Sequence, residues 1–410
     1  MAYMRRISAA RNRLSAADVI KWWPTALIGP ILIAIRLDGV PGLIGMWVWA
    51  PTAVALVILL VLRHTRLVLS PDVALFGGYV SYSALSLLWS PDPGRGLRFV
   101  ALIGVAYLAF LYGRTIGAPT GSSALWQAGF VGLALALAAL LVIQDPADFE
   151  ILNPDRILGM GVLALVVIAW YGPRGRLLTL GLGVLALGTI LLSDSRTTSL
   201  VMVLLLMTAP GLRLPRSGRW LLFGILMVLA ILISLTPGFQ ERWFESGEGN
   251  LWDLVRVQGL DTSGRAEVWP VVADSCRHFV LGEGAGASDS FAFEAHSGFP
   301  EPHNEYLRVW CDGGLVGSVL FWGFVAWIGV GAVVGLRRSP RSWAHLAAAQ
   351  MAAALLYLSL TDNPLTTTIP FMVPAALAFG WSQHQNLSDP DDQIETRLSK
   401  LPPIDRRKGP

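Results

Sequence analysis

Long apolar runs recur along the chain from residue 24 to residue 385, and short polar segments separate them. Many of these runs approach the roughly 17 to 25 residues with which a helix crosses the hydrocarbon core of a bilayer. The pattern predicts about twelve membrane-spanning helices, near residues 24–36, 42–62, 68–89, 97–113, 124–143, 157–171, 177–193, 197–210, 220–236, 304–335, 343–361 and 368–385. A transmembrane barrel would instead show short segments of alternating polarity, so the continuous runs favour a helical bundle.

The composition supports the same class of protein. Hydrophobic residues make up 54% of the chain and charged residues 14%, and the mean hydropathy is +0.55. An ordinary soluble domain carries about 25% charged residues. We therefore expect an all-α polytopic membrane protein that forms one integral membrane domain over residues 1–410, with membrane lipid and no nucleic acid among its partners.

The charges in the short loops predict how the chain is oriented. Several loops contain arginine and no acid, at Arg63 and Arg66, Arg114, Arg174 and Arg176, Arg213, Arg216 and Arg219, and Arg337, Arg338 and Arg341. The alternate loops carry acids, at Asp38, Asp92, Asp145, Asp148, Glu150, Asp155, Asp194 and Asp362. Because Lys and Arg accumulate on the cytoplasmic side, both termini are predicted to be cytoplasmic. The tail over residues 386–410, rich in Asp, Pro and Arg, is expected to be a disordered cytoplasmic end.

One loop on the far side of the membrane is unusually long, from residue 237 to residue 303. Apolar side chains recur in it at helical spacing, at Val268, Val272, Cys276 and Phe279, and its interfacial tryptophans are Trp243, Trp252 and Trp269. We expect this segment to lie along the membrane surface, although a solvated lid fits the same features equally well. The only two cysteines of the chain, Cys276 and Cys311, form no framework that decides whether they pair.

Arginine is the only strongly basic residue type in this loop, at Arg242, Arg256, Arg265 and Arg277. Pairing with the surrounding carboxylates would explain each of these four. Arg196 differs, because it lies in the narrow polar notch "LLSDSRTTSL" between apolar runs, where charge is costly and is usually kept for function. A salt bridge to Asp194 is the alternative. The planar guanidinium is well matched to phosphate, since its donors can bind two oxygens together.

The stretch "FPEPHNEYLRVWCDGGLVG", residues 299–317, places a histidine at the start of a helix. Pro302 precedes it, and apolar residues continue at helical intervals after it. The positive end of the helix dipole disfavours imidazolium, so His303 should be neutral and able to accept a proton. The free amides of this helix end, with Asn304 beside them, should favour an anion such as diphosphate. A capping histidine without catalytic role is the alternative.

Two further features of this region bear on packing and on metal binding. Gly313 and Gly317 form a pair of small residues that would let the span approach a neighbouring helix. His296 and His303 are seven residues apart and lack companion ligands at metal-binding spacing, so we expect no metal site.

The stretch "PHNEYLRVWCDGGLVG" resembles the signature of the O-antigen ligase and polymerase superfamily, in which Pro-His-Asn leads through an acidic residue into Gly-x-x-Gly. "LLWSPDPGRGLRF" resembles the Ser-x-Asp-Pro loop of that superfamily, and "LLSDSRTTSL" resembles its Ser-Arg segment. "SGRAEVWPVVADSCRHFVLGEGAGA" resembles its Gly-Arg-x-x-x-Trp stretch. The resemblance extends over roughly residues 75–380 and departs from the pattern at Asp312, where glutamate is common.

This resemblance implies a GT-C-like fold and a membrane glycosyltransferase of the bacterial inner membrane. The enzyme would move a glycan from an undecaprenyl-diphosphate carrier to an acceptor hydroxyl on the periplasmic face. His303 matches the essential histidine, and Arg196 and Arg265 match the arginines that hold the diphosphate. Further candidates for the site are Arg242, Asp194 and Glu301. Because diphosphate is a good leaving group, inverting transfer with His303 as general base needs no metal, ATP or other cofactor.

Several functions stay open at this point. The acceptor is either the lipid A core, as in a ligase, or a second lipid-linked glycan, as in a polymerase, and we favour the ligase narrowly. A polysaccharide or lipid transporter would also have about twelve spans, but it should carry ionisable residues at mid-bilayer depth. A structural scaffold would not need His303.

Overall fold

The computed structural model describes residues 69–117, 264–296, 301–340, 342–365 and 369–399, with single residues at 57, 201, 224, 228, 231, 240 and 244. Its helices are α4 (Pro71–Ser86), α5 (Pro93–Ile116), α13 (Arg265–Ser275), α14 (Ala287–Ala295), α15 (Glu305–Arg338), α16 (Trp343–Leu358) and α17 (Ile369–Ser399). The predicted spans near 24–36, 42–62, 124–143, 157–171, 177–193, 197–210 and 220–236 lie outside the described residues, apart from single positions. The number of about twelve spans therefore stays a prediction.

The five predicted spans that fall within the described ranges are helices. Two of these are long and apolar enough to cross a membrane, over Pro93–Thr115 in α5 and Glu305–Arg338 in α15, whereas α16 is a shorter apolar helix. Helix α17 continues through Ser399. The prediction of a disordered tail from residue 386 is therefore wrong over residues 386–399. Once a packed helix has formed, each added residue gains a hydrogen bond without a new nucleation step.

Capping residues set where several of these helices begin. Asp92 precedes α5 and accepts a hydrogen bond from the backbone N–H of Arg95, with Pro93 at the first helical position. In the same way, Ser342 caps α16 by accepting from the backbone N–H of His345. Both arrangements satisfy an amide that the helix itself cannot bond.

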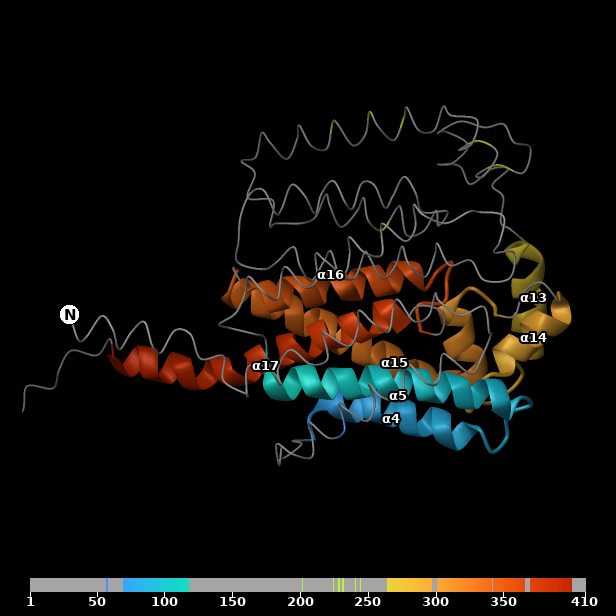
Figure 1. Cartoon of the computed structure of the whole chain (residues 1–410), viewed down its shortest axis with the longest axis horizontal. Coiled ribbons are helices and arrows are strands. Elements are labelled where there is room, and N and C mark those ends of the chain that lie inside the picture. Colours follow the sequence, from blue (N-terminus) through green and yellow to red (C-terminus); the bar gives the residue numbers. More distant parts are fainter. Residues whose placement is uncertain are drawn as a thin grey trace, which may run out of the picture.

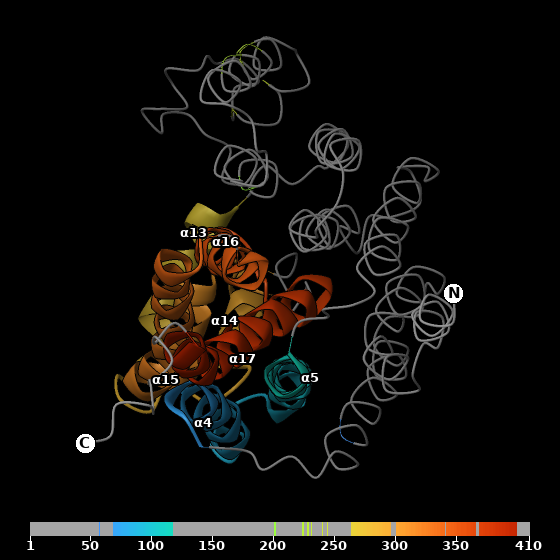
Figure 2. The ribbon, with the colours of Figure 1, turned by 90° about the vertical axis from the view of Figure 1, so that its left-hand side faces the viewer.

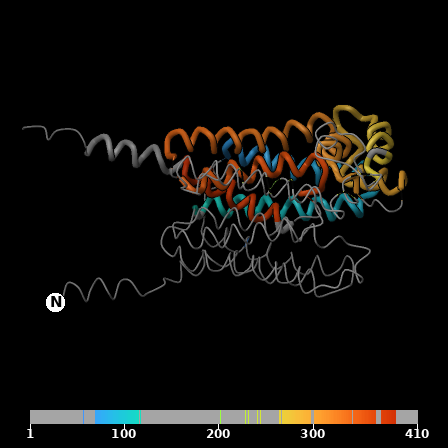
Figure 3. The backbone as a smooth tube through the Cα atoms, turned by 90° about the horizontal axis from the view of Figure 1, so that it is seen from above, coloured from blue at the N-terminus to red at the C-terminus, as the bar shows by residue number. Residues whose placement is uncertain are grey.

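The long helices form a bundle in which α5 and α17 run parallel, while α4 is antiparallel to α15 and α16 is antiparallel to α15 and α17. Helix α5 lies along α17, α4 lies along α15, and α16 packs against α15 and α17 (Figures 1 and 2). A buried ion pair between Arg114 Nε and Asp72 Oδ2, 2.9 Å apart, joins the end of α5 to the start of α4. The short helices α13 and α14 lie together at the other end of these helices, against α15 (Figures 1 and 3).

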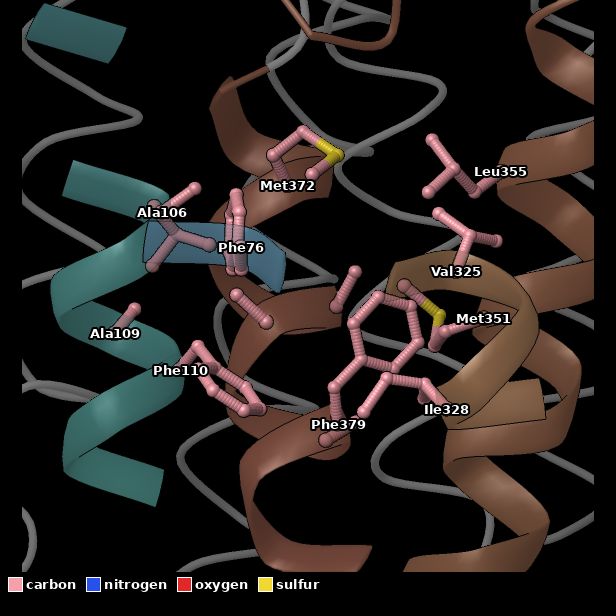
Figure 4. Close-up of a cluster of buried hydrophobic side chains, with 14 of the residues drawn as sticks. Phe76, Ala106, Ala109, Phe110, Val325, Ile328, Met351, Leu355, Met372 and Phe379 are labelled. Carbon is pink, nitrogen blue, oxygen red and sulfur yellow. The ribbon is translucent and has the colours of Figure 1, made fainter. Parts of the chain in front are cut away.

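Aromatic rings and small residues fill the interior of the bundle. Phe76 of α4 stacks on Phe324 of α15 with ring centroids 4.4 Å apart, and Phe110 of α5 meets both rings edge-on. Figure 4 shows this cluster, to which Phe379 of α17 contributes. Helices α5 and α17 approach closely at Gly113, where an added Cβ would lie 2.7 Å from the Leu377 carbonyl oxygen. This packing makes a rigid base for the polar groups at the α13 and α14 end.

Candidate active site

His303 lies immediately before helix α15, as the sequence predicts. Asn304 is the N-cap, and its Oδ1 accepts a hydrogen bond of 3.0 Å from the backbone N–H of Leu307. His303 has φ of 51°, and among the described residues it is the one non-glycine residue with positive φ. Such a conformation costs about 1–3 kcal/mol in a side-chain-bearing residue and is characteristic of functional sites. The surrounding contacts must therefore hold His303 in place.

The turn after α16 supplies the groups that face the imidazole. Nδ1 of His303 lies 3.1 Å from Nδ2 of Asn363 and 3.9 Å from Oδ1 of Asp362. The same turn is fixed to the start of α15, because the backbone N–H of Glu305 donates to the Ser359 carbonyl at 2.9 Å. Sequence analysis places Asp362 in a loop but assigns it no role. The signal that could have found these two residues is the polar stretch "TDNP" directly after an apolar run.

A wholly buried arginine, Arg308, contacts three acidic side chains close to the His303 segment. The guanidinium of Arg308 lies 2.7 Å from Asp289 of α14, 3.2 Å from Glu305 and 3.5 Å from Glu301. Glu301 in turn accepts a hydrogen bond of 2.7 Å from Nδ2 of Asn363. A chain of polar contacts thus connects the buried arginine to the histidine.

The charges in this cluster do not balance, since one guanidinium faces several carboxylates. Burial raises the pKa of the Asp289 carboxyl to about 7, and the attraction of Arg308 only partly opposes this shift. Sequence analysis did not identify Arg308. Its spacing of three residues from Glu305 on one helix face was the available signal.

Helix α13 brings Arg265 toward the histidine segment. Arg265 is the first residue of α13 and follows Gly264, which has φ of 79°. One turn later, the indole Nε1 of Trp269 donates a hydrogen bond of 2.7 Å to the carbonyl of Pro302, the residue before His303. Because residues four apart share a helix face, Arg265 lies on the side of α13 that meets this segment.

The apolar face of α13 packs where the helical spacing predicts. Val268 and Val272 are buried with Ala292 of α14 and Cys311 of α15. Phe279 does not belong to the helix: it lies beyond the helix end, is largely exposed and contacts the Trp310 ring. Cys276 and Cys311 form a disulfide, with Cα atoms 5.1 Å apart, which answers the question left open by the sequence.

Helix α15 is interrupted at Gly314, and the segment after α13 forms backbone hydrogen bonds with the residues at this interruption. At Gly314 the backbone is non-helical, with φ of 57° and ψ of −152°. The amides of Leu315 and Val316 bond instead to the carbonyls of Phe279 and Val280, at 2.9 and 3.2 Å. Sequence analysis points instead to Gly313 and Gly317, but a Cβ added at either position would meet the Tyr82 ring of α4 only at an ordinary contact distance of 3.8 Å.

Asp312 holds the start of α14 on the broken part of α15. Its carboxylate accepts hydrogen bonds from the backbone N–H groups of Gly286 and Ser288, at 2.9 and 2.8 Å. These amides lie at the N-terminus of α14, where a negative charge is favourable. Asp312, noted in the sequence as a departure from the family pattern, therefore joins α14 to α15.

Two of the amides expected to bind diphosphate at the start of α15 have partners within the protein. The amide of Glu305 is bonded to Ser359, and that of Leu307 is bonded to the Asn304 side chain. These two donors are already used within the protein. The amide nitrogen of the Asn304 side chain is the group through which that residue could still bind an anion.

The structure brings together only some of the predicted site residues. Glu301, His303 and Asn304 lie in one short segment, and Arg265 lies on the helix that Trp269 joins to it. The other candidates, Arg196, Arg242 and Asp194, lie outside the described residues, so their predicted roles are untested.

Comparison with known proteins agrees with the resemblance inferred from the motifs. A search of curated proteins finds no match to the chain. Residues 181–322, less than half of the chain, match the family model described as O-antigen ligase. The matched range contains the predicted arginine and histidine motifs as well as α13, α14 and the start of α15. The predicted resemblance to the O-antigen ligase superfamily, a family of membrane proteins, is therefore confirmed.

Proposed function

We propose that this protein is a membrane glycosyltransferase of the O-antigen ligase type. It transfers a glycan from an undecaprenyl-diphosphate carrier to a hydroxyl of the lipid A core, on the periplasmic face of the bacterial inner membrane. The observation that carries this proposal is the strained His303, which faces a carboxylate and lies beside the helix that begins with Arg265. The family match supports the class of reaction.

The reaction is a single displacement at the anomeric carbon. The acceptor oxygen bonds to this carbon, the bond from the carbon to the diphosphate oxygen breaks, and the hydroxyl proton passes to Nε2 of His303. Arg265 and Arg196 neutralise the departing diphosphate, and the Asn304 amide donates a hydrogen bond to it. Attack from the face opposite the leaving group inverts the configuration of the sugar carbon.

His303 can accept this proton at Nε2 only if Nδ1 carries the other hydrogen of the ring. Asp362 supplies an acceptor for that hydrogen, since its Oδ1 lies 3.9 Å from Nδ1. Contacts of catalytic groups often shorten when substrate binds, so this distance is compatible with a hydrogen bond in the reacting complex. Asp362 then stabilises the imidazolium that the transfer creates.

The function is tested with purified protein in lipid nanodiscs. We expect the lipid-linked glycan and lipid A core to give glycan-capped lipopolysaccharide without ATP. A longer lipid-linked glycan, formed when a second lipid-linked glycan is the only acceptor, would identify the alternative, a polymerase. Transbilayer movement of the donor without a new glycosidic bond would contradict the proposal and favour a transporter.

Replacing Arg265 by lysine is expected to lower transfer by about 10- to 100-fold, although the charge is kept. An ammonium cannot bind two diphosphate oxygens in the planar geometry of a guanidinium, and one charge-assisted hydrogen bond is worth about 1.5–3 kcal/mol. The measurement is kcat and KM for the lipid-linked donor. Arg277→Lys is the matched control, because Arg277 is exposed in the same loop. Near wild-type rates for Arg265→Lys would remove Arg265 from the diphosphate site.

A further inference from the structure

We infer that Glu301 and Asn363 are positioning residues that decide which ring nitrogen of His303 carries the proton. In the enzyme without substrate they hold the imidazole in the tautomer that cannot act as base at Nε2. The effect on catalysis rests on the proposed role of His303 as general base. The position of the ring hydrogen does not depend on that role. The inference follows from three contacts at the end of the bundle.

The orientation of the Asn363 amide is fixed by its contact with Glu301. The Oε2 of Glu301 lies 2.7 Å from Nδ2 of Asn363. The same Oε2 lies 3.5 Å from Nη2 of the buried Arg308, and because a guanidinium only donates, this oxygen acts as an acceptor. If the amide were reversed, two oxygens would face each other at 2.7 Å. The NH₂ group of Asn363 must therefore point toward Glu301.

This orientation determines what Nδ1 of His303 can do. Nδ2 of Asn363 has two hydrogens, and besides Glu301 it lies 3.1 Å from Nδ1. Because Nδ2 donates and never accepts, Nδ1 must offer its lone pair. A neutral imidazole has one ring hydrogen, so in this state the hydrogen is on Nε2. Nε2 is the nitrogen that is proposed to take the proton from the acceptor hydroxyl. In this tautomer Nε2 has no free lone pair, so it cannot take that proton.

Asp362 favours the opposite tautomer. Its Oδ1 lies 3.9 Å from the same Nδ1 and would accept a hydrogen from it. Asp362 is thus an acid that contacts the ring, whereas Glu301 and Arg308 lie behind Asn363. In the described geometry Asn363 is the closer partner by 0.8 Å (3.9 Å less 3.1 Å). His303 becomes a base at Nε2 when Asn363 releases Nδ1 and the ring hydrogen moves there to face Asp362.

Such an arrangement would protect the lipid-linked donor. Water that enters the site before the acceptor meets an N–H group rather than a basic nitrogen, so it is not activated to hydrolyse the donor. A preference of about tenfold for the resting tautomer needs ~1.4 kcal/mol, which one or two net hydrogen bonds supply. Loss of either positioning residue should therefore raise hydrolysis of the donor in the absence of acceptor.

The test is ¹⁵N NMR of the full-length protein in nanodiscs, labelled at the histidine rings. The chain has 6 histidines, and the signals of His303 are those that disappear in His303→Ala. At a pH at which His303 is neutral, wild type should show an unprotonated Nδ1 and a protonated Nε2. The reverse pattern in wild type would overturn the inference, whatever the activity of the enzyme.

Two variants and one control assign the effect to the named residues. In Asn363→Ala the hydrogen should move to Nδ1, and in Glu301→Gln both tautomers should appear, since an amide can bond to Asn363 in either orientation. Glu294→Gln, at an exposed position on α14, should leave the wild-type pattern unchanged. An unchanged tautomer in Asn363→Ala or Glu301→Gln would remove that residue from the inference.

An activity measurement separates the inference from the proposed function. Donor hydrolysis without acceptor should rise several-fold in Asn363→Ala, and an unchanged rate would contradict the protective role. If wild type shows the expected tautomer but His303→Asn transfers glycan normally, the proton placement holds and the proposed base role fails. If either variant does not fold, the wild-type spectrum alone still decides the tautomer.

Discussion

Removing the imidazole of His303 is expected to lower glycan transfer by about 10²- to 10⁴-fold, the usual contribution of a positioned acid or base. The best substitution is His303→Asn. Asparagine adopts positive φ more readily than most residues, so the backbone at 51° should be kept while the base is lost. Binding of the lipid-linked donor should change little, because the arginines remain. The effect should therefore appear in kcat rather than in KM.

The control for this experiment is His296→Asn, which changes an exposed histidine in the same part of the chain. Its rate should stay within about twofold of wild type, as is usual for surface substitutions. A folded, donor-binding His303→Asn protein that transfers glycan within a few-fold of wild type would end the general-base assignment. His303 would then be a residue that shapes the start of α15.

The sequence predicts the helices of this protein well where the apolar pattern is long. An apolar run such as that of α5 has few ways to satisfy its backbone in lipid other than as a helix, so the pattern alone is sufficient there. The short helix α14 cannot be predicted in this way, because its sequence "ASDSFAFEA" is neither long nor strongly apolar. Its start depends on Gly286, which has φ of 88°, and on the carboxylate of Asp312. The latter contact joins residues far apart in sequence.

The same difference explains which site residues the sequence reveals. His303 and Arg265 lie in recognisable motifs, and the position of His303 follows from the local rules of a helix start. Asp362 and Asn363 acquire their role only because the turn after α16 is fixed beside that helix start. No local pattern states this contact, so it had to come from the three-dimensional arrangement.

Gly314 is the glycine whose backbone conformation matters in this region, although the sequence motif points to its neighbours. The pair of glycines at 313 and 317 has the spacing of close helix packing, yet the conformation that only glycine adopts easily is at position 314. The spacing rule assumes a continuous helix. Here the helix is broken, and the segment containing Val280 and Gly282 supplies the missing backbone partners.

Gly314→Ala is therefore expected to destabilise the protein by at least about 3 kcal/mol, or to prevent its accumulation in the membrane. The backbone there, with φ of 57° and ψ of −152°, is strongly unfavourable for any side chain. An added Cβ would also lie 2.5 Å from the carbonyl oxygen of Val280 and from the amide nitrogen of Gly282. Both contacts are to backbone atoms, and the Val280 carbonyl bonds to the amide of Val316. Neither atom can move away without disturbing the junction between the loop and α15.

Gly317→Ala is the matched control, three residues further along the same helix. Its nearest contacts would be the Val309 carbonyl oxygen at 3.6 Å and aromatic carbons at 3.8 Å, which are ordinary packing distances. Because alanine is favoured over glycine in a helix by about 1 kcal/mol, this variant should be as stable as wild type or slightly more stable. Thermal unfolding of the two purified proteins in the same nanodiscs measures the difference. A Gly314→Ala protein that unfolds at the wild-type temperature would show that α15 is continuous through residue 314, and the placement of the loop against it would then be wrong.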